Sequence, residues 1–461
     1  MEPKYTHLKQ IFTILFSVVM LSMSYAQCWS KVEGGGFHTL AIKSDGTLWA
    51  WGDNSAGQIG DNTIVDKLSP VQVGTASNWS RIAAGTKNSF AIKTDGTLWG
   101  WGFNGYGNLG EGTFFNRSVP TQIGTATDWK QVTCGDLHTM ATKNNGTLWS
   151  WGYNGYGQLG IGNTTDTTIR TQVGTDTDWS TIEASFDNSI ALKTNQKCYA
   201  WGRNNYGQLL GDGTLVNKNI PTQVEATFNW KQITIGLAYT MAIKSDNSLW
   251  GWGLNDYGQL GNGTVTNGYL GAQIGTAVNW SQITAGRAHT LAMKIDNTLW
   301  AWGRNDYGQL GIGTFVDTTV RTQVGTDTWF KITSGSLHTV AIKSDGTLWT
   351  WGFNNNGQLG DGTTTNKNIP IFIICPTSLA VQDQNQVVSQ YLLYPNPITN
   401  NTFSIQSKNT IINVEAFDIV GKKIVIEKND NFYKIQAASG IYALKIIDSD
   451  GNSQFKKLII N

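Results

Sequence analysis

Short runs in which apolar and polar residues alternate with a period of two recur along most of the chain. Residues 45–52, with the sequence DGTLWAWG, form one such run. A strand over this octet places its two tryptophans on one face and Leu48 and Ala50 on the other. Its opening Asp-Gly pair suits a tight hairpin turn that needs a positive φ. The pattern therefore predicts short antiparallel strands joined by tight turns.

The octet belongs to a sevenfold repeat of about 50 residues. Its second tryptophan recurs at steps of 49 to 51 residues, as Trp51, Trp101, Trp151, Trp201, Trp252, Trp302 and Trp351. Another tryptophan opens each unit: Trp29, Trp79, Trp129, Trp179, Trp230, Trp280 and Trp329. The first tryptophan of the octet is present in six units and is Tyr199 in the fourth, so the repeat holds all 20 tryptophans. Near-identical copies favour packing between neighbouring sheets over an aromatic ligand site.

Each unit contains the pattern of four short strands. In the sixth unit these are residues 280–286, 289–294, 298–303 and 321–325. Four strands repeated seven times predict an all-β fold, a β-propeller, whose ring also removes exposed sheet edges. The fourth unit has Asn195-Gln196 in place of the usual turn pair, so its hairpin is expected to be either longer or strained.

Composition narrows the class of protein. The net charge is +1 and charged residues make up 14% of the 461-residue chain, while Gly reaches 53 and Trp 20. A chain this uncharged offers no basic footprint for nucleic acid and no acidic tail. The turn-rich, aromatic composition agrees with an all-β protein.

Three segments carry a resemblance to a known family. Residues 283–293 (ITAGRAHTLAM), 332–342 (ITSGSLHTVAI) and 299–314 (LWAWGRNDYGQLGIGT) closely resemble the regulator of chromosome condensation repeat. The resemblance implies a seven-bladed β-propeller over residues 27–374. Units two, four and five depart from the motif, with Asn88, Asn188 and Tyr239 at a histidine position.

The N-terminus resembles a secretory signal. Residues 1–26 combine two lysines, an apolar run over 11–23 and small residues before Gln27. We expect cleavage after Ala26. Cys28 raises the alternative of a lipoprotein, but residues 25–27 do not form the small-residue box that a lipid-modified cysteine follows. The mature chain has no other apolar run long enough to span a membrane.

The repeat stops after Ile374. Residues 375–390 have the composition of a linker, and residues 391–461 return to period-two alternation, which predicts a small β-sandwich. With the segment YPNP at 394–397, this part resembles the C-terminal sorting domain of type IX secretion cargo from Bacteroidetes. The resemblance implies binding to the type IX machinery through 391–461 and a mature protein that is secreted or held at the cell surface.

Four histidines share one repeat position and could form a metal site across the closed ring: His38, His138, His289 and His338. Asn and Tyr hold this position in the other units, so structural hydrogen bonding is favoured. The GGG run at 34–36 resembles a phosphate loop only superficially, because no helix pattern follows it. We find no catalytic or cofactor motif and expect neither an enzyme nor a bound cofactor or metal.

Variation within the repeat marks a possible binding surface. The residue after each Trp-Gly pair falls where a strand enters a loop, and it differs from unit to unit: Asp53, Phe103, Tyr153, Arg203, Leu254, Arg304 and Phe353. Aromatic residues and arginine are favoured at binding hot spots, although neutral drift at exposed positions would look similar. The more regular Tyr106, Tyr156, Tyr206, Tyr257 and Tyr307 are expected to be structural.

Three functions fit this sequence. The first is a secreted, non-enzymatic binding propeller that recognises an extracellular protein or glycan. The second is enzyme inhibition, as in a β-lactamase inhibitory protein with this propeller. The third, guanine nucleotide exchange, is disfavoured. In the family that activity is attributed to an inserted wedge, whereas no unit here gains more than one residue, and a secreted protein meets no small GTPase.

The cysteines suggest a covalent closure of the ring. Cys28 and Cys375 lie just outside the first and last repeats, and closure of the ring would bring them within a few residues of each other. That spacing suits the ~5.5–6 Å Cα separation of a disulfide, and secretion supplies an oxidising compartment. Two unrelated thiols are the alternative. Cys134 and Cys198 replace core residues and are expected to stay reduced.

Overall fold

The computed structural model describes residues 28–224, 229–376, 391–394, 396–398, 400–407, 409–418, 422–429, 432–449 and 453–460. The expected signal segment and most of the expected linker lie outside these residues. The chain divides into two compact units, Met1–Pro376 and Thr377–Asn461. The described residues form strands and turns without a helix, and hence show no helix that could cross a membrane.

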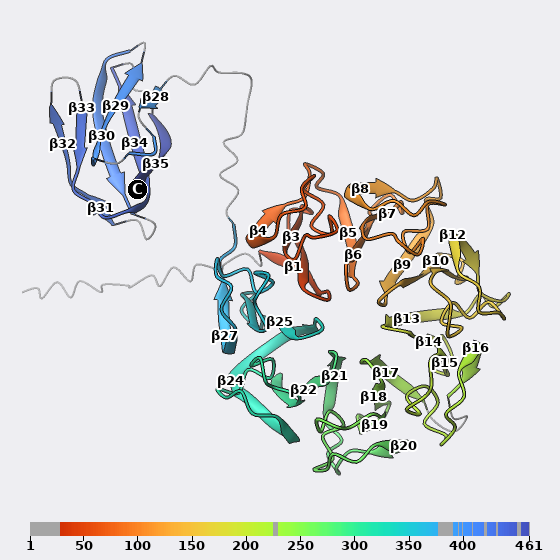
Figure 1. Ribbon diagram of the computed structural model, residues 1–461. Helices are drawn as coiled ribbons and strands as arrows, with labels where there is room; N and C mark the ends of the chain where they lie inside the picture. The colour runs from red at the N-terminus through yellow and green to blue at the C-terminus, as the bar shows by residue number, and fades with distance from the viewer. Residues whose placement is uncertain are drawn as a thin grey trace, which may run out of the picture. The chain divides into compact units, whose positions relative to one another are not determined.

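The first unit is a ring of antiparallel sheets in which strands follow one another in chain order (Figure 1). The first strand of each repeat lies nearest the centre of the ring and the fourth lies at its periphery. The first repeat comprises β1 (Trp29–Gly34), β2 (His38–Lys43), β3 (Leu48–Gly52) and β4 (Lys67–Gln72). The second comprises β5 (Trp79–Ala84), β6 (Asn88–Lys93), β7 (Leu98–Gly102) and β8 (Arg117–Gln122). The third comprises β9 (Trp129–Cys134), β10 (His138–Lys143), β11 (Leu148–Gly152) and β12 (Thr167–Gln172).

The fourth and fifth repeats follow the same plan. The fourth comprises β13 (Trp179–Ser185), β14 (Asn188–Lys193), β15 (Cys198–Gly202) and β16 (Lys218–Gln223). The fifth comprises β17 (Trp230–Ile235), β18 (Tyr239–Lys244), β19 (Leu249–Gly253) and β20 (Gly268–Gln273). The hairpin expected to differ in the fourth repeat has the usual length, and Gln196 adopts a φ of 65° in the left-handed region. This hairpin is therefore strained rather than longer, because a φ in this region costs glutamine conformational energy that glycine does not pay.

The last two repeats share one seven-stranded sheet. The sequence pattern predicted a strand at 321–325 and a separate strand opening at Trp329. Instead, β24 continues unbroken for 17 residues, so that its first part pairs with β23 and its last part with β25. The strands are β21 (Trp280–Ala285), β22 (His289–Lys294), β23 (Thr298–Gly303), β24 (Thr318–Ser334), β25 (His338–Lys343), β26 (Leu348–Gly352) and β27 (Lys367–Ile373).

Neighbouring repeats pack and form hydrogen bonds with each other around the second tryptophan of the octet. Trp101 is fully buried and its indole N–H donates to the carbonyl oxygen of Gln58 in the preceding repeat, at 2.8 Å. The hydroxyl of Ser89 donates to the same oxygen, at 2.8 Å. An equivalent hydrogen bond joins the first repeat to the seventh, because the Thr39 hydroxyl donates to the carbonyl oxygen of Gln358, at 2.9 Å. The expected packing role of this tryptophan is confirmed.

The first tryptophan of the octet has a different role, which the sequence did not reveal. Trp99 is only partly buried, and its indole N–H donates to the Thr97 hydroxyl at 2.9 Å. The Lys93 ammonium lies 4.8 Å from the ring centroid of Trp79 and 4.0 Å from that of Trp99. This lysine position lies over indole or phenol rings in every repeat. The first tryptophan thus holds a cation–π cluster near the hairpin end of each sheet.

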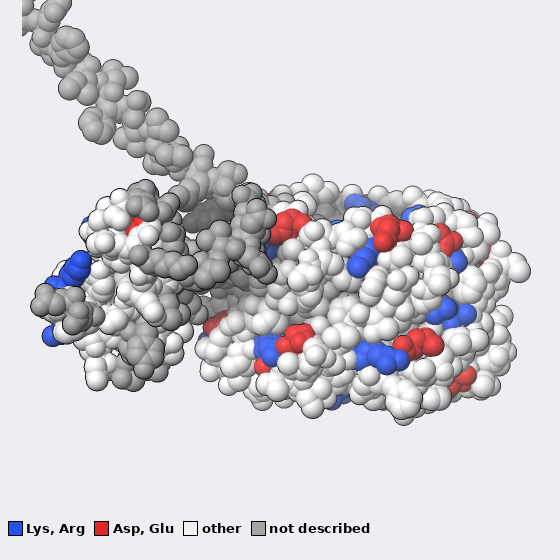
Figure 2. All heavy atoms as spheres, turned by 90° about the horizontal axis from the view of Figure 1, so that it is seen from above, with Lys and Arg blue, Asp and Glu red and all other residues white. Residues whose placement is uncertain are grey.

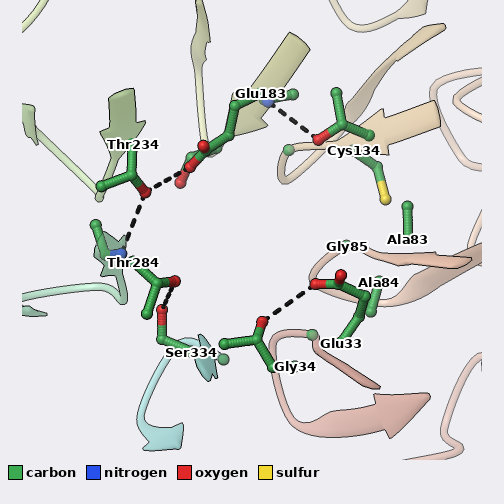
Figure 3. Close-up of a pocket in the computed structure, with 18 of the residues that line it drawn as sticks. Glu33, Gly34, Ala83, Ala84, Gly85, Cys134, Glu183, Thr234, Thr284 and Ser334 are labelled. Atoms are coloured by element: carbon green, nitrogen blue, oxygen red, sulfur yellow. Dashed lines mark hydrogen bonds between the residues drawn. The ribbon is translucent and has the colours of Figure 1, made fainter. Parts of the chain in front are cut away.

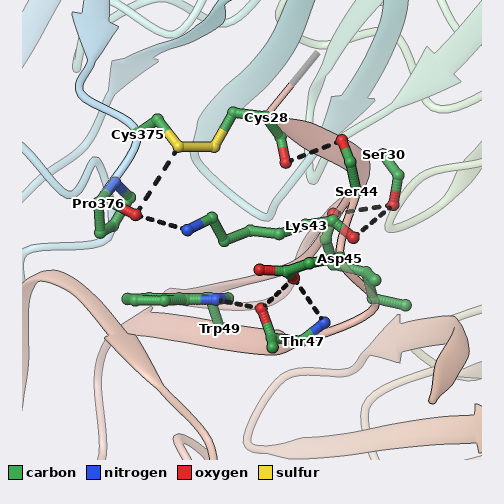
Figure 4. Close-up of a disulfide and its surroundings, with 10 residues drawn as sticks. Cys28, Ser30, Lys43, Ser44, Asp45, Thr47, Trp49, Cys375 and Pro376 are labelled. Atoms are coloured by element: carbon green, nitrogen blue, oxygen red, sulfur yellow. Dashed lines mark hydrogen bonds between the residues drawn. A yellow bond between two sulfur atoms is a disulfide. The ribbon is translucent and has the colours of Figure 1, made fainter. Parts of the chain in front are cut away.

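Cys28 and Cys375 form a disulfide between the two ends of the ring, with their Cα atoms 6.2 Å apart (Figure 4). The Lys43 ammonium donates to the Pro376 carbonyl oxygen at 2.5 Å, and the Ser44 N–H donates to that of Cys28 at 2.9 Å. Cys134 and Cys198 are free and buried, as expected of core residues. Burial raises the pKa of both thiols, which keeps them protonated.

The second unit contains two four-stranded antiparallel sheets, in the orders β28-β29-β33-β32 and β31-β30-β34-β35. Buried residues of both sheets form a single apolar cluster, which includes Phe403 and Leu444. The sequence pattern did not predict β32 and β33, whose exposed sides are largely polar. The strands are β28 (Tyr391–Tyr394), β29 (Thr402–Ser407), β30 (Ile411–Phe417), β31 (Lys423–Ile424), β32 (Ile426–Asn429), β33 (Phe432–Ile435), β34 (Gly440–Asp448) and β35 (Ser453–Ile460).

Candidate functional site

The variable residues that follow each Trp-Gly pair lie at one end of the sheets. In the second repeat, Gly102 turns the backbone with a φ of 93°, and the Phe103 N–H then donates to the Lys87 carbonyl oxygen at 2.8 Å. The hairpins between the second and third strands lie at the opposite end, because His38 pairs with Gly52 at the start of the second strand and the end of the third. All seven variable residues therefore lie on one face of the ring.

A buried asparagine fixes the loop beside each variable residue. The side-chain oxygen Oδ1 of Asn104 accepts a hydrogen bond from the Leu109 N–H at 2.9 Å. Its amide donates to the carbonyl oxygens of Thr113 and Phe115, at 3.0 and 3.1 Å. The same fully buried residue recurs in every repeat, as Asn54, Asn104, Asn154, Asn204, Asn255, Asn305 and Asn354. The variable side chains thus stand on a constant and rigid frame.

In several repeats the residue two positions further along contacts the variable side chain. Phe103 and Tyr153 lie against Gly105 and Gly155, where an added Cβ would come within 2.5 and 2.2 Å of the aromatic side chain. Arg304 instead forms a bidentate ion pair with Asp306, at 2.9 and 2.6 Å. The second and third repeats therefore match glycine to an aromatic residue, and the fourth and sixth match a polar acceptor to arginine, whereas Phe353 is followed two positions later by Asn355.

The aromatic side chains of neighbouring repeats touch in sequence. Tyr106 lies 5.3 Å from Tyr153 between ring centroids, Tyr153 lies 6.2 Å from Tyr156, and the Arg203 guanidinium lies 5.0 Å from the Tyr156 ring. A second arc continues the pattern on the fifth to seventh repeats and the first. We call both arcs together the aromatic belt: Phe103, Tyr106, Tyr153, Tyr156, Arg203, Tyr257, Arg304, Tyr307, Phe353 and Phe37.

The structure differs from two expectations about the residues on this face. The tyrosines are not purely structural, since Tyr106 and Tyr257 are more than one-third exposed and share the surface of the variable residues. Asp53 is not an exposed binding residue, because it is 5% exposed. Its carboxylate accepts hydrogen bonds from the Ser55 N–H and the Gln58 amide, at 2.9 and 2.8 Å. Leu254 is half-buried outside the belt.

The four histidines are buried structural residues. The Nε2 atoms of His38 and His138 lie 2.9 Å from the hydroxyls of Ser89 and Ser189 in the next repeat. Nε2 of His338 lies 3.1 Å from the Thr39 hydroxyl across the ring closure. Structural hydrogen bonding is thus confirmed for these three. Burial lowers the pKa of His38 to about 4, so its ring is neutral. No group of three His, Cys, Asp or Glu side chains that could hold a metal ion occurs in the described part of the chain.

The first strands enclose a central cavity of about 360 Å³ that the sequence analysis missed (Figure 3). Glu183 accepts hydrogen bonds from the Thr234 hydroxyl at 2.6 Å and the Ile235 N–H at 3.2 Å. Glu33, at the same repeat position, accepts one from the Thr333 hydroxyl at 3.1 Å. These side chains join inner strands that do not pair directly. The sequence feature that could have indicated these contacts is a glutamate at a repeat position that holds threonine or alanine in the other units.

The cavity raises the pKa of the Glu183 carboxyl group. Burial raises its pKa to about 7, while hydrogen bonds from Thr234 and Ile235 partly oppose the shift. Its carboxyl group can therefore exchange a proton near neutral pH. Neither Glu183 nor Glu33 is hydrogen-bonded to a histidine, cysteine or second carboxylate within the described residues.

The rim of the ring carries few charges, and several of them are paired. Figure 2 shows acidic and basic side chains side by side on a largely uncharged surface. Lys67 and Asp61 form one such pair at 2.8 Å, and Arg117 and Glu111 form another at 3.0 Å. The rim therefore offers no strong attraction to a highly charged polymer.

Fold and site together define a propeller of repeated four-stranded units that displays aromatic and arginine side chains on one face. Residues 17–264, more than half of the chain, match the RCC1-like domain. Residues 246–293, 296–342 and 345–387 match the regulator of chromosome condensation (RCC1) repeat. The chain therefore belongs to the RCC1-like family. Residues 392–461 match the secretion system C-terminal sorting domain, which indicates export by the type IX system to the cell surface or the medium.

Known relatives resemble parts of this chain. It is 50% identical over 44 residues to the ultraviolet-B receptor UVR8 of Arabidopsis thaliana, and the match spans about 10% of either protein. Human WBSCR16 is 22% identical with a TM-score of 0.65, over 71% of this chain and 94% of that one. Prp20p of Saccharomyces cerevisiae, whose binding to Gsp1p and histones has been characterised, is 21% identical with a TM-score of 0.64, over 77% of this chain and 90% of that one. These structures support the propeller fold alone.

Proposed function

We propose that this protein is an exported, non-enzymatic binding protein. Its first unit is a seven-bladed propeller, and its second is a β-sandwich used for sorting. The propeller recognises an extracellular protein or glycan through the face that carries the aromatic belt. The belt itself is the observation that supports this function most directly.

Three properties of the belt favour binding over drift. Tyrosine, phenylalanine and arginine are the residues that most often dominate binding energy. Their side chains are held by matched neighbours such as Gly105 and Asp306, so little conformational entropy is lost on binding. The asparagine frame beneath them is constant from repeat to repeat, while the residue after each Trp-Gly pair varies. Drift would not require such matched neighbours.

Enzyme inhibition is a special case of this proposal, in which the bound protein is an enzyme. Guanine nucleotide exchange is not proposed. The binding of Gsp1p and histones belongs to the yeast protein, and no repeat of this chain contains an insertion longer than one residue.

The test is a triple variant with Phe103→Ala, Tyr153→Ala and Phe353→Ala. The native protein is first immobilised and exposed to the proteins and polysaccharides of the culture medium. We expect the variant to melt within a few degrees of the native protein and to bind the retained partner at least about tenfold more weakly.

Phe330→Ala is the matched control, because Phe330 is exposed near the hairpin end of the ring, away from the belt. This control should bind as the native protein does. Unchanged affinity of the triple variant would place the binding site elsewhere, and a native protein that retains neither proteins nor polysaccharides would refute the function.

A further inference from the structure

A second set of exposed side chains lies on the same face as the belt. The loop between the third and fourth strands of each repeat places two consecutive residues at its tip. In the first two repeats these are Ile64, Val65, Phe114 and Phe115, which are 68%, 64%, 61% and 72% exposed. We call all such pairs the loop tips. Apolar tips recur at Leu215 and Val216, Val265, and Phe315 and Val316. Exposed apolar groups this large are uncommon on a surface with no partner.

The loop tips are rigid. The buried asparagine that follows each variable residue donates to the carbonyl oxygen of the second tip residue in all seven repeats. Asn54 donates to Val65 at 3.1 Å and Asn104 to Phe115 at 3.1 Å. The other five bonds are equivalent. The apolar side chains are therefore displayed on fixed backbone, next to the belt, rather than on flexible loops.

The loops that carry the tips of the first two repeats are joined by a hydrogen bond. Asn62, in the first loop, donates through its N–H to the carbonyl oxygen of Ser118 at 2.9 Å. Ser118 lies in β8, a few residues after Phe115. Phe103 and Tyr106 of the belt belong to the same repeat, with their ring centroids 6.4 Å apart. The result is an apolar and aromatic region across two adjacent repeats.

Asp66 and Lys87 border this region with opposite charges, and both are hydrogen-bonded: the Asp66 carboxylate accepts from the Asn54 N–H and the Asn356 amide, and the Lys87 ammonium donates to the Ser55 hydroxyl. The tip residues are uncharged, and the two arginines of the belt already have partners: Arg203 pairs with Asp187 at 3.4 Å and Arg304 with Asp306 at 2.6 Å. A highly charged polymer would therefore gain little here. The four apolar tip residues offer no side-chain hydrogen bonds, so a glycan lying on them would bury hydroxyl groups without partners, which is unfavourable. A polypeptide with apolar side chains meets neither difficulty.

We propose that the partner of this face is a polypeptide with an uncharged, apolar contact surface, and that it docks on the loop tips of the first two repeats together with the adjacent belt. This inference rests on the proposed function and specifies its partner. The tips provide the apolar contact area, and Phe103 and Tyr106 provide the aromatic contacts beside it.

The chain itself supplies the substitution that tests this proposal. The third and seventh repeats carry Thr-Thr at their tips, on the same asparagine-bonded backbone. A variant with Ile64→Thr, Val65→Thr, Phe114→Thr and Phe115→Thr should therefore keep the fold and the melting temperature. Phe330→Thr is the matched control, because it removes an exposed aromatic ring away from this face.

The full mature chain and both variants are immobilised and probed with a random 12-residue peptide library and, in parallel, with a panel of neutral polysaccharides. We expect the native protein and the control to retain peptides rich in apolar residues, and the tip variant to bind them at least about tenfold more weakly. Equal peptide binding by the tip variant would overturn the proposal.

The other outcomes separate this inference from the function on which it rests. Retention of a polysaccharide that is lost in the tip variant would overturn the polypeptide partner but leave a binding propeller. Sedimentation of the native chain as a dimer that the tip variant abolishes would identify a second copy as the occupant and also overturn the proposal. Retention of neither probe would refute both.

Discussion

Breaking the Cys28–Cys375 disulfide should destabilise the ring at the point where it closes. Within the described residues, no sheet contains strands from both the first and the last repeat, because β1–β4 form one sheet and β21–β27 another. The ends therefore meet through side-chain packing, the Glu33–Lys331 ion pair, hydrogen bonds such as that of Thr39 with Gln358, and the disulfide. The disulfide is the one covalent closure among these contacts.

The size of the effect follows from the length of chain between the two cysteines. They are 347 residues apart, and the loop-entropy relation then gives about 6 kcal/mol at 25 °C. Removing native disulfides costs about 2–5 kcal/mol in practice, so we expect a loss of about 4 kcal/mol. Unfolding entropy scales as about 2.1 cal/mol/K per residue, which for about 350 residues converts this loss into a decrease in Tm of about 5 °C.

The assay compares the native protein with a Cys28→Ser, Cys375→Ser variant in thermal melting, each with and without a reductant. The native protein should lose about 5 °C on reduction, whereas the variant should already melt at the lower temperature and not respond. Non-reducing peptide mapping establishes the bond directly. A free Cys28 thiol in the exported protein, or a reduced protein with an unchanged Tm, would refute this reasoning.

Two further predictions concern the core. Burial lowers the pKa of the four histidines from 6.5 to about 4 or about 3. As the pH falls, the unfolded chain therefore binds protons before the folded chain does, and the stability that is present above pH 6.5 is lost towards pH 4. Glu183, whose pKa is raised to about 7, offsets this effect by about one proton. The free energy of unfolding, measured by urea denaturation, should rise with pH by at most about 4 kcal/mol per pH unit near pH 5.5. The His138→Asn variant should reduce this slope by the contribution of about one proton. A free energy of unfolding that does not change with pH would contradict the burial argument. Trp101→Ala should cost about 3–5 kcal/mol, against about 1–2 kcal/mol for the partly exposed Trp99→Ala in the same strand. Equal losses would show that the two indoles share one role.

The strands and the repeat could be predicted from the sequence. Period-two alternation and the spacing of Trp51, Trp101 and their equivalents are local properties, and a strand expresses them wherever it packs. For the same reason the variable position after Trp-Gly was recognisable as a set, since its members occupy equivalent points in consecutive repeats. The closeness of Cys28 and Cys375 followed from the closure of that repeat into a ring.

The contacts between repeats were decided only by the tertiary structure. Asp53 looks like an exposed loop residue in the sequence, but Ser55 and Gln58 satisfy its carboxylate and bury it. Glu183 resembles a surface residue, yet the inner strands surround it and raise its pKa. The exposure and the pKa of these side chains depend on atoms brought within a few ångströms by distant parts of the chain. A local pattern does not contain that information, so the belt, the cavity and the rigid loop tips emerged only once the repeats closed into a ring.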